Sequence, residues 1–343
     1  MRADRVAALA AALVAGGRGV VALDEPARSR RFAALELPDT AEVRRAWREV
    51  ALEAPGWERF AGGAILSDES IRSTGARGSV VAALRARGIV PGVALDAGAA
   101  PLPGTLGEPV TEGLDGLRRR LTEYALLGAG FGTWRAVFRA EPSDEAVAAN
   151  AHALARCAAL AQENGLVPVL ELELRDEGDH DVTVAAASAE RVLRRTIAEL
   201  AAARVAFDGL LLAPTMVAAG RSAPANDDVT EVVAETLRVL GATVPVAVAG
   251  IAFLIDGQPP ALAAQRLCAL NRAMPRRRPW PLTFSYGAAL RTAALETWRG
   301  REERVADARR LLLHRAYCAN AAACGAYSAK LEDPRTLAFP LAA

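Results

Sequence analysis

The chain is almost without lysine: Lys330 is the only one, against forty arginines in 343 residues. Any chemistry that depends on a lysine amine therefore has a single candidate in the sequence. A composition rich in arginine and alanine accounts for most of this shortage. Such a bias replaces lysine by arginine. It does not explain the replacement of a lysine by a small uncharged residue.

Other shortages exclude whole classes of function. The cysteines, Cys157, Cys268, Cys318 and Cys324, form no CxxC pair and no zinc spacing, which is typical of reduced thiols in a cytoplasmic protein. The formal net charge of +1 gives no electrostatic case for nucleic acid or a membrane surface as a partner. No segment has the roughly 20 consecutive apolar residues of a membrane span. The expected partner is a small molecule.

Short apolar runs alternate with longer helical patterns along the chain. The N-terminal residues predict an amphipathic helix that ends at Gly16-Gly17, and not a signal peptide, because charges interrupt the apolar run. Residues 146–165 give the clearest helix, with an Asn-Gly stop. Apolar runs predict eight strands, at 20–25, 62–66, 90–96, 131–138, 166–174, 207–214, 244–254 and 281–287.

Eight strands that alternate with helices predict an α/β fold. We expect a single parallel (β/α)8 barrel, a TIM barrel, over residues 1–343, with 326–343 as a C-terminal tail. The sequence contains no linker or low-complexity tract that would indicate a second domain. Active sites of such barrels lie at the C-terminal ends of the strands, so polar residues late in a strand are the candidates.

Two glutamates stand near the end of the fifth predicted strand. Glu171 and Glu173 are two residues apart and therefore share one face of the strand. Acids in an apolar strand are costly to bury without partners. Either Arg135 pairs with them as a buried ion pair, or they face a solvated mouth and titrate, and the convergence of several acids favours the second interpretation. The other candidates near strand ends are Asp24, Asp96, Thr133, Ser285 and Tyr286.

Several segments together resemble class I fructose-bisphosphate aldolase over nearly the whole chain. They are PLPGTLGE (101–108) with GLDGL (113–117), NGLVPVLELEL and GDHD (within 164–181), GIAFLIDGQ (250–258) and PWPLTFSYGAAL (279–290). The resemblance implies a TIM barrel, a homo-oligomer and no required cofactor. It also implies cleavage of a ketose bisphosphate through an imine on a lysine, which accepts the electrons of the broken C–C bond. The GDHD segment is implied to be a structural loop and not a metal site.

The resemblance carries over unevenly to the residues of this chain. The position of the imine lysine is Ala213, and the lysine before the fourth-strand tryptophan is Thr133. Two further lysines correspond to Ala94 and Ala97, and a phosphate-binding arginine corresponds to Ala288. The positions that match the family's acid–base glutamate, first-strand aspartate, fourth-strand arginine, serine and tyrosine are Glu171, followed by Glu173, and Asp24, Arg135, Ser285 and Tyr286.

The lost cations leave Asp24, Asp96, Glu171 and Glu173 with chiefly Arg135 to balance them. Either like charges raise the pKa of some of these acids, or a divalent metal held by the four carboxylates fills the gap, although no metal motif supports it. We expect little or no binding of fructose bisphosphate, and a neutral, cationic or singly anionic ligand instead. The shortened side chains also predict a larger, more apolar cavity.

Two functions remain open. The first is an enzyme that performs C–C lysis or formation, dehydration, isomerisation or cyclisation on a non-bisphosphate molecule, as in specialised metabolism. Glu171 or Glu173 would be the general acid or base, with Asp24 as a second carboxylate. The second function is a non-catalytic pseudoaldolase that acts as a scaffold or binds a ligand. Retention of acids whose burial costs stability favours the enzyme. Lys330 is expected to be a solvated residue of the C-terminal tail. The substrate site would be lined by Arg135, Ser285, Tyr286, Asp96, Thr133 and Ala213.

Overall fold

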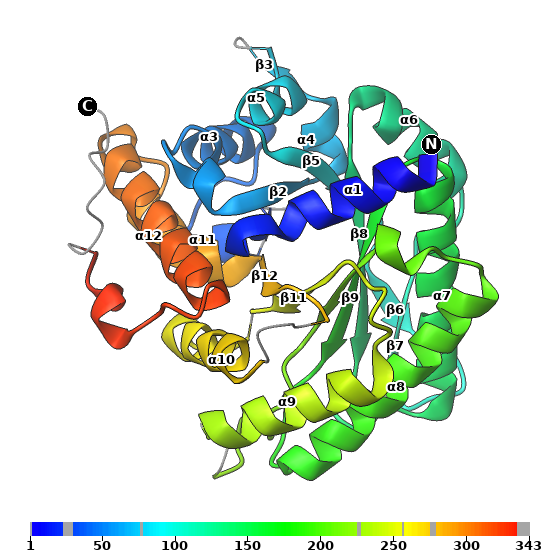
Figure 1. Ribbon diagram of the computed structural model, residues 1–343. Coiled ribbons are helices and arrows are strands. Elements are labelled where there is room, and N and C mark those ends of the chain that lie inside the picture. The colour runs from blue at the N-terminus through cyan, green and yellow to red at the C-terminus, as the bar shows by residue number, and fades with distance from the viewer. Residues whose placement is uncertain are drawn as a thin grey trace.

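The computed structural model describes residues 2–22, 30–75, 78–224, 228–255, 257–274 and 279–334. Within them, parallel strands close into a barrel in the spatial order β1-β12-β11-β10-β9-β8-β5-β2 (Figure 1). The predicted (β/α)8 barrel is therefore confirmed. Its strands are β1 Gly19–Ala22, β2 Ala61–Leu66, β5 Val90–Ala94, β8 Phe131–Phe138, β9 Val167–Leu174, β10 Leu211–Pro214, β11 Gly250–Leu254 and β12 Leu282–Tyr286.

Two strands begin well after the start of their predicted apolar runs. Residues 207–209 form the short helix η3, so β10 begins at Leu211. Residues 244–249 precede β11, and there the carbonyl of Pro245 accepts hydrogen bonds from Val248 N at 3.1 Å and Trp280 Nε1 at 2.8 Å. These apolar residues approach the N-terminal end of the barrel as turns, a conformation that periodicity alone does not distinguish from a strand.

Helices surround the barrel, and two short hairpins extend from it. No helix in the described part of the chain is long and apolar enough to cross a membrane. The hairpins pair β3 Thr74–Gly75 with β4 Gly78–Ser79 and β6 Ala99–Pro101 with β7 Pro109–Thr111. Apart from α1, which is described in the next paragraph, the α-helices are α2 Arg30–Ala34, α3 Ala41–Leu52, α4 Asp68–Arg72, α5 Val80–Ala86, α6 Leu117–Leu127, α7 Asp144–Glu163, α8 Val182–Ala202, α9 Val229–Thr243, α10 Pro260–Ala273, α11 Ala288–Trp298 and α12 Val305–Ala323.

Helix α1, Arg2–Val14, lies across the N-terminal end of the barrel (Figure 1). Its buried Leu13 belongs to the same apolar cluster as Phe131 and Leu211 of the strands, and burial of such a side chain contributes about 2 kcal/mol. A Cβ on Gly62 of β2 would lie 1.9 Å from the Leu13 carbonyl oxygen, so only glycine permits this approach. The N-terminal end is closed, and the C-terminal end carries the candidate site.

Part of the predicted tail is packed and not free. The short helix η5, Ala329–Glu332, lies against α12, where Arg315 forms an ion pair with Glu332. The hydroxyl of the buried Tyr327 donates to Glu332 at 2.6 Å. Lys330 is exposed, as expected of a solvated lysine. Residues 335–343 lie outside the described part.

Candidate active site

Strand register brings three of the candidate residues into one row at the C-terminal end of the barrel. Arg135 of β8 lies opposite Glu171 of β9, and Glu171 lies opposite Ala213 of β10. Side chains alternate along a strand, so Glu171 shares the face of Val169, which belongs to the apolar interior cluster. The row Arg135–Glu171–Ala213 therefore crosses the inner wall of the barrel mouth.

Glu173, two residues after Glu171 on β9, pairs with Arg135. The guanidinium Nε donates to Glu173 Oε2 at 2.5 Å, and Nη2 contacts the same oxygen. The two side chains are 43% and 25% exposed, respectively. The pair thus combines the two interpretations of the sequence: an arginine does hold one of the glutamates, but at a solvated mouth and not in the core.

Towards the barrel axis the row is closed. Glu171 is 9% exposed, and Ala213 is fully buried in the cluster of Leu211 and Val169. Thr133 and Ser285 are also buried. Neighbouring apolar side chains therefore pack against the methyl group of Ala213, and the predicted larger, more apolar cavity at this position stays a prediction.

Tyr286 does not join the other candidates. Successive strand residues point to opposite faces, so Tyr286 faces away from Ser285 and into the outer core. Its ring centroid lies 5.3 Å from that of Phe284, and the charge of Arg315 on α12 acts on it. The side chain is buried in the core between the barrel and α12, so the contact with substrate expected of Tyr286 stays a prediction that its burial does not favour.

Asp96, just after β5, is held by backbone groups. Its carboxylate accepts hydrogen bonds from Gly98 N at 3.2 Å and Arg135 N at 3.4 Å. Burial raises the pKa of Asp96, while these donors and the charge of Arg135 oppose the rise. Burial and then the charge of Asp96 raise the pKa of the Cys157 thiol on α7. A raised pKa was expected at this site, but here its cause is desolvation and not the neighbouring acids.

The divalent-metal site hypothesised from Asp24, Asp96, Glu171 and Glu173 stays a prediction. Among the residues that the structure describes, no group of three or more histidine, cysteine, aspartate or glutamate side chains could hold a metal ion. Asp24, one of the four candidate acids, lies outside the described residues.

A cavity of about 600 Å³ opens beside Arg135 and Glu173, beyond the ends of β8 to β11. Three of its lining residues were not singled out from the sequence as site residues: His180, Arg221 and Arg266. They lie on loops and on α10, where strand periodicity gives no signal. The GDHD segment was the one sequence feature that pointed to His180. Its resemblance to a structural loop of the family, however, gave no reason to place His180 at a cavity.

Backbone hydrogen bonds fix the two loops that form one wall of this cavity. Gly220 N donates to His180 O at 2.7 Å, Arg221 N to Asp176 O at 2.6 Å, and Ser222 N to Gly178 O at 2.9 Å. Asp181 accepts from Val184 N at 2.9 Å and caps α8. The GDHD segment is thus structural, as the resemblance implied, and it also positions His180 at the cavity.

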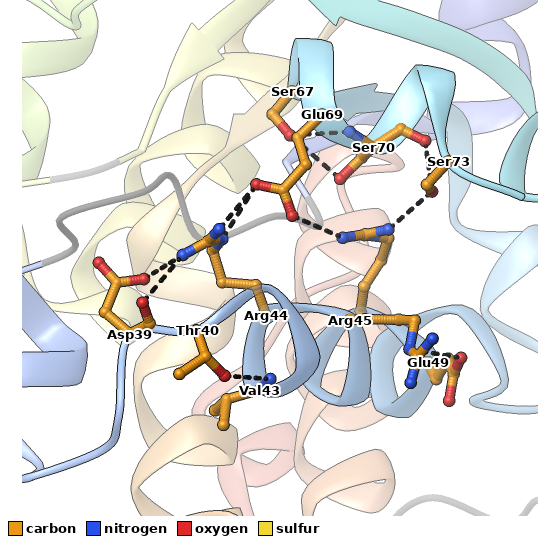
Figure 2. A network of polar contacts seen from close by, with 11 residues as sticks. Asp39, Thr40, Val43, Arg44, Arg45, Glu49, Ser67, Glu69, Ser70 and Ser73 are labelled. Carbon is orange, nitrogen blue, oxygen red and sulfur yellow. Dashed lines mark hydrogen bonds and ion pairs between the residues drawn. The ribbon is translucent and has the colours of Figure 1, made fainter. Parts of the chain in front are cut away.

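On the β2 side of the mouth, arginines of α3 are engaged with the protein's own acids (Figure 2). Arg44 pairs with Asp39 and, through Nη2, with Glu69 at 2.9 Å. Ser67 caps α4 by accepting from Ser70 N at 3.2 Å, which fixes Glu69 in the first turn. These carboxylates offset positive charge that a phosphate group would otherwise attract.

Comparison with known proteins gives consistent matches. The family model of fructose-bisphosphate aldolase class-I matches residues 5–338. A probable fructose-bisphosphate aldolase class 1 of Xylella fastidiosa is 43% identical over 304 residues, 87% of this chain and 90% of that protein. A fructose-bisphosphate aldolase of Dictyostelium discoideum is 40% identical over 335 residues, 95% and 93% of the two chains. The solved aldolase of Plasmodium falciparum, in complex with TRAP and a small-molecule inhibitor, has a TM-score of 0.92 at 37% identity, covering 95% and 96%.

Proposed function

The chain belongs to the class I fructose-bisphosphate aldolase family, and we propose that it is a member whose chemistry proceeds without an imine. In this proposal it is a repurposed enzyme that uses carboxylate acid–base catalysis on a small molecule other than a bisphosphate. The row Arg135–Glu171–Ala213 carries the proposal. A methyl group stands at the position that the resemblance assigns to the imine lysine, beside an acid and a cation that remain.

Lys330 does not replace the missing amine. It is exposed on η5, whose neighbouring Glu332 is bound to Arg315 and whose Leu331 carbonyl lies 2.7 Å from His314 Nε2. These contacts hold the segment on α12. An exposed lysine also lacks the surrounding groups that activate an amine as a nucleophile.

The remaining groups suit proton abstraction next to a carbonyl. Glu171 would take the proton, and the electrons of the broken C–H bond would move onto the carbonyl oxygen to give an enolate. Arg135, fixed by Glu173, would stabilise the negative charge. Where the carbon that lost the proton bears a hydroxyl group, the hydroxyl proton moves to the enolate oxygen, and return of the abstracted proton to the former carbonyl carbon gives isomerisation. Loss of hydroxide from the next carbon, which takes the proton from Glu171 and leaves as water, gives dehydration. Both outcomes balance without a cofactor.

Hydrogen–deuterium exchange in D2O tests this function without a known substrate. Neutral, cationic and singly anionic carbonyl compounds are incubated with the protein, and loss of their C–H signals is followed by NMR. We expect exchange with a subset of compounds, its loss in Glu171→Gln, and its retention in Glu303→Gln, an exposed control on the short helix η4, Glu302–Arg304. Fructose bisphosphate is expected to give neither cleavage nor exchange.

The alternative, a pseudoaldolase that binds a ligand or acts as a scaffold, is favoured by one observation, the complete burial of Ala213. Absence of exchange with every compound, together with a Glu171→Leu variant more stable than the parent, would favour it. A buried acid without a catalytic role should lower the free energy of unfolding, and its replacement by leucine should raise that free energy again.

The setting of the protein is part of the same proposal. The small-molecule partner, a homo-oligomeric assembly and the absence of a required cofactor follow from family membership. A cytoplasmic location agrees with a relative from Cicer arietinum, 40% identical, named as a cytoplasmic isozyme. A role in biosynthesis is inferred only from the positions, such as Ala213 and Ala288, at which this chain departs from the residues of class I fructose-bisphosphate aldolase.

A further inference from the structure

We propose that the cavity of about 600 Å³ beyond β8 to β11 binds a small organic acid with one carboxylate and an apolar body. This inference rests on the proposed function for the statement that the acid is the substrate. The binding itself is argued from the lining residues alone. It places the ligand to one side of the barrel axis, over the loops that follow β9 and β10.

The charges that line the cavity match a single anion. Four arginines face three carboxylates among the described lining residues, so four positive charges less three negative charges leave an excess of one, with the single histidine counted as neutral. One carboxylate balances this excess, whereas a bisphosphate brings several negative charges. The charged lining residues are Arg135, Arg175, Arg221, Arg266, Glu173, Asp176, Glu177 and His180.

Arg221 is the group placed to receive the carboxylate. Its Nη2 donates to Asp176 Oδ1 at 2.8 Å and lies 3.4 Å from Gly257 O, which holds the guanidinium at the cavity. The two side chains of the ion pair are 62% and 36% exposed. An exposed pair of this kind contributes only about 0–1 kcal/mol, so a ligand carboxylate replaces Asp176 at little cost. Guanidinium also offers two parallel donors to a carboxylate.

The wall behind the charged groups is apolar. Met216 and Val217 follow β10 and are largely buried, and Leu254 ends β11. Ala185 and Ala189 lie one turn apart on α8 and present only methyl groups to the cavity. The volume falls within the usual range of small-molecule sites, about 300–1,000 Å³. An aromatic or branched aliphatic body fits such a wall.

The cavity is lined by part of the proposed active site. Arg135, Glu173 and Arg221 all line it. A molecule anchored by its carboxylate at Arg221 would therefore share the cavity with the Arg135–Glu173 pair. The anchoring arginine is distinct from the arginine that stabilises charge at the reacting end.

The test is equilibrium binding of three 2-oxo acids, phenylpyruvate, 2-oxoisocaproate and 2-oxooctanoate, by calorimetry and ligand-observed NMR. Phenylacetone serves as the uncharged analogue of the first. We expect at least one acid to bind once per chain and more tightly than its uncharged analogue. Loss of a charged hydrogen bond in Arg221→Met should weaken binding by about tenfold or more. Arg195→Met, which removes an exposed arginine on α8, should leave it unchanged.

Filling the cavity is the second arm. Ala189→Trp should abolish binding, and Ala218→Phe, on the loop, serves where the helical variant does not fold. Binding by none of the acids, or binding indifferent to Arg221→Met and to both filled variants, would overturn the inference. Binding without exchange in D2O supports the inference and removes the proposed function. Exchange that is unaffected in Arg221→Met supports the proposed function and overturns the inference.

Discussion

Ala213 lies directly opposite Glu171 in the register of β9 and β10, and its methyl group is sealed from solvent. A lysine cannot be restored there without cost. We expect Ala213→Lys to lower the free energy of unfolding by about 1–3 kcal/mol through overpacking alone, with a further cost of burying charge. Urea unfolding measures the loss, and Ala213→Met separates size from charge.

The same variant tests the account of substrate loss. Ala213→Lys is expected not to cleave fructose bisphosphate, because Thr133 and Ala94 also stand where the resemblance expects cations. A coupled assay for triose phosphate release gives the answer. Cleavage by this single variant would show that the lost phosphate anchors are not what excludes the bisphosphate.

The ion pair of Arg135 and Glu173 should contribute little to stability. Because both side chains reach solvent, a double-mutant cycle with Arg135→Met and Glu173→Gln should give a coupling free energy of about 0.2–1 kcal/mol. Urea unfolding at low and high salt measures it. Coupling of several kcal/mol would mean that the pair is part of the core and not of a solvated site.

Asp96 should make stability depend on pH in a defined direction. Burial raises the pKa of Asp96 in the folded chain, so the folded state binds more protons than the unfolded one. Its contribution to stability therefore falls as pH rises from the unfolded pKa of about 3.9 through the folded value, and it is constant above that. Unfolding of the parent and Asp96→Asn across this range is the measurement. The variant should gain relative to the parent with rising pH, and a gain by the parent would contradict us.

Gly62 should not tolerate a side chain. A Cβ there would meet the Leu13 backbone, so Gly62→Ala must displace α1 and should cost about 1–3 kcal/mol or more. Gly241, in α9, has nothing within 4 Å of its Cβ position. Gly241→Ala should therefore stabilise by about 0.5–1 kcal/mol through helix propensity. Equal effects of the two variants would show that the approach of α1 is not constrained.

The barrel could be predicted from sequence because each strand is a short apolar run between helical patterns. Residues 244–249 were assigned to a strand wrongly, since an apolar composition does not distinguish a turn from a strand, and Val246 is in fact exposed. Arg135 and Glu171 followed from polar residues late in strands, whereas Ala213 followed from the family resemblance. The position of Tyr286 could have been deduced, because it neighbours Ser285 and must face the opposite way.

The cavity could not be predicted in the same manner. Arg221 and His180 are brought together by backbone hydrogen bonds between two loops that are more than thirty residues apart in the chain. Such contacts carry no periodic pattern. The burial of Asp96, which decides its protonation, likewise depends on packing against β8 and α7 and not on its own neighbours in sequence.

Helix α1 has a consequence for the order of assembly during synthesis. Val14 packs against Gly250 of β11, and Arg18 O, just after the helix, accepts a hydrogen bond from Thr283 Oγ1, 265 residues away. These partners on β11 and β12 are synthesised long after α1, whereas its partner Gly62 of β2 is available early. The packing of α1 is therefore completed only after β12 has been made, and closure of so long a loop makes a slow step.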